Sequence, residues 1–112
     1  MTSPSTSEQV RALNDAFRTA GSISGDWIMA AGVSAKGVPF ATAAMAAVRR
    51  FDNFTEDNDP YGEHDFGAFE LAGEKLFWKL DYFDRDLHFG SDDPADPAVT
   101  RRVLTIMLAS EY

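Results

Sequence analysis

The segment of residues 66–82 constrains the fold more than any other part of the sequence. It contains two stretches of strand-forming residues, Phe66–Leu71 and Lys75–Tyr82, joined by a short connection that contains glycine. In the second stretch, large apolar side chains recur at every second position and share one face: Leu76, Trp78, Leu80 and Tyr82. A turn at Ala72–Gly73 or at Gly73–Glu74 puts glycine where a positive φ is favourable. The segment therefore predicts an antiparallel β-hairpin.

The hairpin determines which loops lie together. Residues that enter its first strand lie beside residues that leave its second strand, because the two strands are antiparallel. The loops 52–64 and 83–95 are therefore expected to meet at one end of the sheet. Each loop is about a dozen residues long, a length at which connections without secondary structure are uncommon and often functional.

Helices are predicted for three other segments. The first begins at Thr6, whose side chain suits the N-cap, and ends before Gly21. The second begins at Pro39, because proline loses no hydrogen bond in the first turn of a helix. The third begins at Asp96, an N-cap residue followed by proline. Its apolar residues are spaced as on one wide face of a helix: Val99, Val103, Leu104, Ile106, Met107 and Leu108.

The run Asp26–Val33 is almost continuously apolar, which predicts a short central strand covered on both faces, or else the start of a buried helix. With the strand, the element order is α-β-α-β-β-α. This order predicts an α/β protein of the α+β type, in which about three strands are packed by three helices. At 112 residues, the chain is expected to be a single domain over residues 1–112, with residues 1–6 as a disordered tail.

Negative charge is concentrated between Asp52 and Asp96. This stretch holds 14 of the 18 acidic residues and is opposed only by Lys75, Lys79 and Arg85. The whole chain has a net charge of −8. Such a charge disfavours nonspecific binding to nucleic acid, because phosphates attract Lys and Arg, but it suits a basic protein partner.

The candidate partner-binding residues lie in or beside the two loops. We expect them to form one acidic, aromatic-lined patch: Asp57, Asp59, Tyr61, Glu63, Asp65, Asp84, Asp86, Asp92 and Asp93. Carboxylates spread over a folded surface can imitate the spaced charge of a nucleic-acid backbone. The alternative is a solvated acidic face that only aids solubility. In the same way, the residues 59–62 have the composition of a type I turn, which explains them without a function.

A metal site is the alternative use of this region. His64 and Asp81 are predicted on the same face of the hairpin at its open end. With Glu63, Asp84 or His88, they would supply nitrogen and oxygen ligands suited to manganese, iron or zinc. The spacing of these residues matches no established metal-binding loop.

The sequence favours a non-enzymatic protein over an enzyme. It has no cysteine, no Gly-x-Ser-x-Gly motif and no glycine-rich phosphate-binding motif. We therefore assign no catalytic residue and expect no cofactor.

Three segments carry a family resemblance: Asp-Asn-Asp-Pro-Tyr-Gly-Glu-His-Asp-Phe-Gly (57–67), Phe-Trp-Lys-Leu-Asp-Tyr-Phe-Asp-Arg-Asp-Leu (77–87) and Asp-Pro-Ala-Asp-Pro-Ala-Val-Thr-Arg-Arg-Val-Leu-Thr-Ile-Met-Leu-Ala (93–109). The chain resembles the family called domain of unknown function 3768, most specifically from Phe51 onward. Members of that family are small bacterial proteins, often associated with plasmids and other mobile elements. The resemblance implies no catalytic residues.

Charge and setting together lead to a functional expectation. We expect a cytoplasmic inhibitor of the anti-CRISPR or antirestriction type, which occupies the basic nucleic-acid-binding surface of a host nuclease or CRISPR effector. Such a protein binds neither nucleic acid directly nor a membrane. The alternatives are a metal-dependent enzyme or ligand-binding domain that uses the His64/Asp81 cluster, and a homodimeric or homo-oligomeric scaffold.

Overall fold

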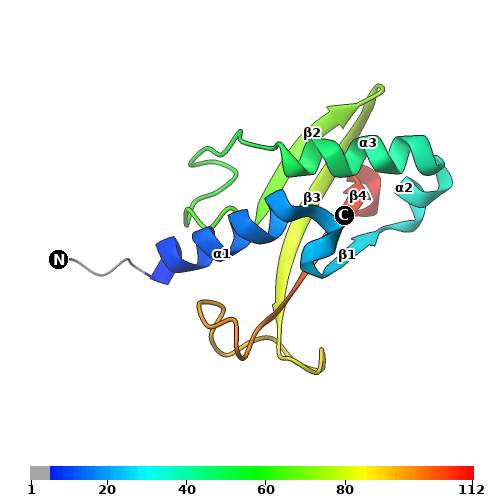
Figure 1. Ribbon diagram of the computed structural model, residues 1–112. Coiled ribbons are helices and arrows are strands. Elements are labelled where there is room, and N and C mark those ends of the chain that lie inside the picture. Colours follow the sequence, from blue (N-terminus) through cyan, green and yellow to red (C-terminus); the bar gives the residue numbers. More distant parts are fainter. Residues whose placement is uncertain (1–5) are drawn as a thin grey trace.

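Helices cover one face of a four-stranded sheet in the computed structural model, which describes residues 6–112 (Figure 1). The strand order is β1-β4-β3-β2. The strands are β1 (Asp26–Met29), β2 (Phe66–Leu71), β3 (Glu74–Phe83) and β4 (Arg101–Leu108). Strand β1 is parallel to β4, and the other neighbouring pairs are antiparallel. The predicted α+β class is therefore confirmed, with four strands in place of about three.

The predicted hairpin is formed by β2 and β3. Leu71 pairs with Glu74, so the turn consists of Ala72 and Gly73, the first of the two alternatives. Their φ angles are +53° and +81°, as a two-residue type I′ turn requires. The apolar face of β3 points toward the helices and is buried there.

Two of the predicted helices are present. Helix α1 (Thr6–Ala20) ends at the expected glycine, and a 3-10 helix (Gly21–Ser24) follows it. Helix α3 (Val38–Arg49) contains the predicted proline in its first turn. Thr6 belongs to α1 and not to the predicted tail, and residues 1–5 lie outside the described part of the chain. Within residues 6–112, no helix is long and apolar enough to cross a membrane.

The helix predicted from Asp96 is wrong, because the chain forms strand β4 there. Both faces of β4 are largely buried, and this explains its continuous apolar run. Asp96 does cap a backbone group, because its Oδ1 accepts a hydrogen bond from the Ala98 N–H at 2.9 Å. That contact closes a local turn, and no helix follows from it.

The strand predicted over Asp26–Val33 is shorter than expected and lies at the edge of the sheet. It ends at Met29, and a short helix α2 (Ala31–Ala35) begins two residues later. Strand β4, which has a strand on each side, occupies a central position in the sheet that was predicted for Asp26–Val33. The half-exposed Ile28 shows that β1 is not covered on both faces.

The core lies between the sheet and helices α2 and α3. Trp78 on β3 is completely buried and contacts the ring of Phe51 edge-on, at a centroid distance of 5.5 Å. The other buried apolar residues of this core come from both helices and from the two middle strands: Val33, Ala44, Val48, Leu76, Leu80, Leu104 and Ile106. Helix α1 lies beside α3 in front of the sheet, and its first half extends past the sheet toward the two long loops (Figure 1).

Candidate functional site

Asn14 on α1 is the centre of a buried polar network. Its side chain is completely inaccessible to solvent. The amide nitrogen donates hydrogen bonds to the Glu63 carbonyl at 2.9 Å and to the Tyr82 hydroxyl at 2.8 Å. The amide oxygen accepts a hydrogen bond from Nε of Arg102 at 2.6 Å. One side chain therefore connects helix α1, the loop before β2, and strands β3 and β4.

Arg102 extends this network to the second long loop. It is 7% exposed, and its Nη2 donates to the carbonyl of Pro94. Its guanidinium lies over the ring of Tyr82, 5.2 Å from the centroid. The two long loops were expected to meet at one end of the sheet, and here both are attached to a single Asn14–Arg102 pair.

Two predicted site residues, Glu63 and Asp65, lie at this network in partly buried positions. Burial raises the pKa of the Glu63 carboxyl, and the charges of Asp65 and Asp59 add to the increase. Burial also raises the pKa of Asp65, although hydrogen bonds from its own backbone N–H and from the Tyr82 hydroxyl oppose the change. These carboxylates therefore belong to the interior of the site rather than to an open acidic patch.

His64 and Asp59 form a second compact cluster in the same loop. The His64 ring stacks on Phe54 with a centroid distance of 3.7 Å, and its Nδ1 lies 2.8 Å from Oδ1 of Asp15. Asp59 is almost completely buried and accepts the His64 backbone N–H at 3.0 Å. That hydrogen bond holds His64 at a φ of +54°, in the left-handed region. Asp59 thus stabilises the loop and is not a surface residue.

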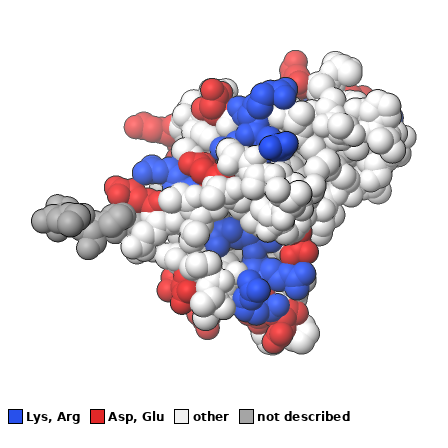
Figure 2. Space-filling model, viewed as in Figure 1, with Lys and Arg blue, Asp and Glu red and all other residues white. Residues whose placement is uncertain are grey.

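The remaining predicted site residues stay at the surface, on two separate loops. Asp57 and Tyr61 are exposed on the loop before β2, and Asp86, Asp92 and Asp93 are exposed on the loop after β3. Asp84 is partly exposed, and its Oδ1 accepts the His88 backbone N–H at 2.9 Å. Figure 2 shows acidic side chains in separate groups, with basic side chains between them. The exposed members of the expected patch therefore come from both loops, and in this view the acidic side chains form no single continuous surface.

The alternative metal ligands do not come together. His64 pairs with Asp15, whereas Asp81 pairs with Lys79 at 3.2 Å. His88 lies exposed on the other loop. Among residues 6–112, no three His, Asp or Glu side chains converge as a metal site requires.

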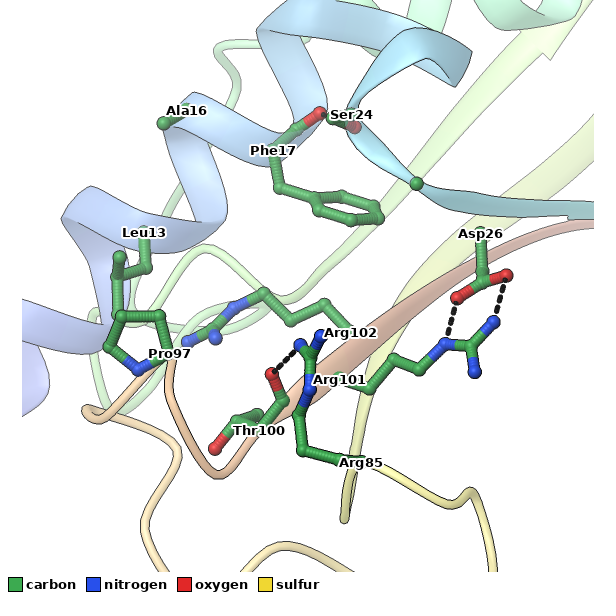
Figure 3. A pocket seen from close by; sticks show the side chains of 11 residues that line it. Leu13, Ala16, Phe17, Ser24, Asp26, Arg85, Pro97, Thr100, Arg101 and Arg102 are labelled. Atoms are coloured by element: carbon green, nitrogen blue, oxygen red, sulfur yellow. Dashed lines mark hydrogen bonds and ion pairs between the residues drawn. The ribbon is translucent and has the colours of Figure 1, made fainter.

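A basic pocket of about 600 Å³ lies beside the network and was not predicted (Figure 3). Arg85, Arg101 and Arg102 line it, together with one side of α1 and residues 24–26, of which the last is the first residue of β1. The sequence feature that could have indicated this pocket is the Arg101–Arg102 pair just outside the acidic stretch. The erroneous helix assignment concealed this signal, because it did not place these side chains beside Arg85.

Comparisons with known proteins identify a family but no activity. A search of curated proteins and a search of solved structures each found no match. The family model described as "Protein of unknown function (DUF3768)" matches residues 29–111. The match includes α2, α3 and all of β2 to β4, whereas α1 lies before it. The chain belongs to the DUF3768 family.

Proposed function

We propose that the chain is a non-enzymatic interaction protein whose two acidic loops bind a basic protein surface. The observation that carries the proposal is the pairing of exposed aromatic side chains with exposed carboxylates on both loops. Tyr61 is 79% exposed on the first loop, and Phe89 is 75% exposed on the second. Exposed aromatic residues of this kind are the side chains that most often dominate the energy of protein interfaces.

The exposed carboxylates around these aromatic residues are not engaged in ion pairs within the described part of the chain. Six of them are exposed: Asp52, Glu56, Asp57, Asp86, Asp92 and Asp93. None of the six forms an ion pair with another residue of the part that the structure describes. Their charge is therefore directed to the solvent, where it accelerates association with a basic partner.

The partner class follows from this charge. A surface built to bind nucleic acid is basic and also accepts a folded acidic surface, with a steep dependence on salt. The proposed partner is therefore the nucleic-acid-binding surface of a host nuclease or CRISPR effector, and the proposed location is the cytoplasm, where such effectors act. The inhibitor role is argued by analogy, from charge and from the mobile-element setting that the family resemblance implies.

Affinity capture from a bacterial lysate tests the proposal. At low salt, the immobilised chain should retain a basic nucleic-acid-binding protein, and salt should release it. The variants Tyr61→Ala and Phe89→Ala should each weaken retention, whereas Ile23→Ala, which removes an equally exposed apolar side chain outside the loops, should not. Retention of nothing at low salt, or equal retention by all variants, would contradict the proposal.

A homo-oligomer is a second candidate, favoured by one observation on the opposite face of the sheet. Tyr112 is 76% exposed and packs edge-on against Phe66 and Phe77, with centroid distances of 6.0 and 5.4 Å. Of the described residues, the 3-10 helix Ala109–Glu111 and Tyr112 contact this face, whereas α2 and α3 pack on the other one. Light scattering distinguishes the candidates: a dimer that Tyr112→Ala dissociates supports the oligomer, and a monomer at all concentrations excludes it.

A further inference from the structure

The basic pocket lies between three parts of the chain. Helix α1 forms one wall, the start of β1 forms the second, and the last residues of the long loop with the start of β4 form the third (Figure 3). Its volume of about 600 Å³ is within the range of small-molecule sites in proteins. The pocket is separate from the exposed carboxylates of the two acidic loops, none of which lines it.

The charge of the lining is positive, although the protein as a whole is strongly acidic. Arg101 is neutralised, because its Nε and Nη2 donate to the two oxygens of Asp26 at 2.6 and 3.1 Å. Asp26 is the only carboxylate among the lining residues. Arg85 and Arg102 therefore contribute two positive charges that no carboxylate of the lining balances.

Arg85 and Arg102 differ in how firmly they are held. Arg102 is fixed by its hydrogen bonds to Asn14 and Pro94, so its position is set before any ligand arrives. Arg85 is exposed, and its one hydrogen bond, from Nη1 to the Thr100 carbonyl, is long at 3.3 Å. In Figure 3 its guanidinium lies between the other two arginines. Arg85 can therefore turn its remaining donors toward a ligand.

The opposite wall is apolar. Leu13 and Phe17 of α1 and Pro97 of the loop line the pocket. Gly25 permits this arrangement, because a Cβ at that position would lie 3.2 Å from Cε2 of Phe17. The pocket thus combines guanidinium donors on one side with an aromatic ring and aliphatic carbons on the other.

We propose that this pocket binds a small organic anion that carries a phosphate or a carboxylate on an apolar body. Guanidinium groups recognise both oxyanions through paired hydrogen bonds, and the Phe17 wall accepts the apolar part. The inference does not depend on the acidic loops or on any protein partner. A ligand here contacts α1 and the long loop together, and it links both to β4.

Titration with four probes, followed by NMR of the backbone amides, tests the assignment. Phenyl phosphate and benzoate share a ring and differ in the oxyanion, benzyl alcohol lacks the charge, and inorganic phosphate lacks the ring. At least one aromatic anion should bind with a Kd below about 1 mM and shift the amides of Phe17, Gly25 and Thr100. Inorganic phosphate should bind more weakly, and benzyl alcohol should not bind.

Matched variants locate the site. Arg85→Gln should weaken binding at least about tenfold, because a charge-assisted contact is lost. Arg50→Gln makes the same charge change at an exposed position outside the pocket and should leave binding unchanged. Ala16→Glu places a competing carboxylate in the pocket and should abolish binding, whereas Ala12→Glu, also exposed on α1 but outside the pocket, should not.

Two results would overturn the proposal. One is that neither aromatic anion shifts the pocket amides at about 10 mM, which is far above the expected Kd. The other is that Arg85→Gln and Arg50→Gln weaken binding equally, because the anion would then respond only to net charge. Both results leave the protein-binding proposal intact, since that proposal concerns other residues.

Discussion

Nε of Arg102 donates a 2.6 Å hydrogen bond to Oδ1 of Asn14, and both side chains are almost completely buried. The bond joins a residue inside the range matched by the family model to a residue outside that range. Arg102 lies within the residues that match the DUF3768 model, and Asn14 lies on the helix that precedes them. Helix α1 therefore completes the network that attaches both long loops to the sheet, and it also supplies one wall of the basic pocket.

Replacing Asn14 by alanine should destabilise the protein strongly. The change removes three hydrogen bonds and leaves the buried guanidinium of Arg102 without its amide partner. We expect a loss of about 2–4 kcal/mol in the free energy of unfolding, measured by urea denaturation. Asn53→Ala, at an exposed position, should change stability by less than about 0.5 kcal/mol. Equal stability of the two variants would show that the network contributes little.

Gly67 on β2 should not tolerate a side chain. A Cβ at this position would lie 2.6 Å from Cζ of Phe51 and even closer to Nε1 of Trp78. We expect Gly67→Ala to destabilise the fold by about 1–3 kcal/mol, because the tightly packed rings must move. Gly90→Ala is the control, since its nearest neighbour would be 3.9 Å away. Thermal denaturation of the two variants measures the difference, and a neutral Gly67→Ala would contradict the packing described.

The hairpin was predictable from the sequence, and the last strand was not. In β3, the buried apolar residues Leu76, Trp78 and Leu80 fall at every second position, and this period of two occurs in no helix. In β4, apolar residues are nearly continuous because both faces are largely buried, so periodicity does not distinguish a strand from a buried helix. The Asp96–Pro97 dipeptide then favoured a helix start, whereas in the structure Asp96 caps only a local turn.

The hairpin turn offers a stabilising substitution. Ala72 adopts a φ of +53°, which is unfavourable for alanine and tolerated by asparagine. Ala72→Asn gives the Asn-Gly pair preferred in type I′ turns and should stabilise the protein by about 0.5–1 kcal/mol. Ala72→Val should destabilise it, because β-branched residues avoid this region. Urea denaturation measures both changes, and the opposite order of stability would exclude the turn geometry.

Protonation of Asp65 should stabilise the fold. Burial raises the pKa of this carboxyl above its value in the unfolded chain. The stability contributed by the protonated carboxyl is therefore fully present below the unfolded pKa, and it is lost as pH rises through the folded pKa. Asp65→Asn removes the charge and retains an acceptor for the Tyr82 hydroxyl. The variant should therefore be more stable than the parent at neutral pH, and the difference should disappear in acid.

Denaturation curves at several pH values measure this effect. Asp57→Asn is the control, because that carboxylate is exposed. A parent protein that is more stable than Asp65→Asn at neutral pH would mean that the ionised carboxylate is stabilised in the site.

The location of the acidic residues was predictable, but their burial was not. Hairpin geometry correctly connected the two loops, yet Asp59 is buried, and Glu63 and Asp65 are partly buried where their loop is held against Asn14 of α1. Which side of the sheet α1 covers is a long-range property, and no local pattern in the sequence records it. The basic pocket was missed for the same reason, since Arg101 and Arg102 are more than 80 residues from the α1 side chains that line it with them.

The most direct test of the proposed function is displacement of nucleic acid. A captured partner is purified and bound to a fluorescent oligonucleotide, and the chain is titrated in while fluorescence anisotropy is recorded. We predict that one equivalent of the chain lowers the anisotropy to that of the free oligonucleotide. The Asp86→Asn variant should weaken this effect. The Glu70→Gln variant should not, because it changes an exposed carboxylate on the β2–β3 hairpin, outside the two loops. If the oligonucleotide stays bound when the partner is saturated with the chain, the acidic loops do not occupy a nucleic-acid-binding surface.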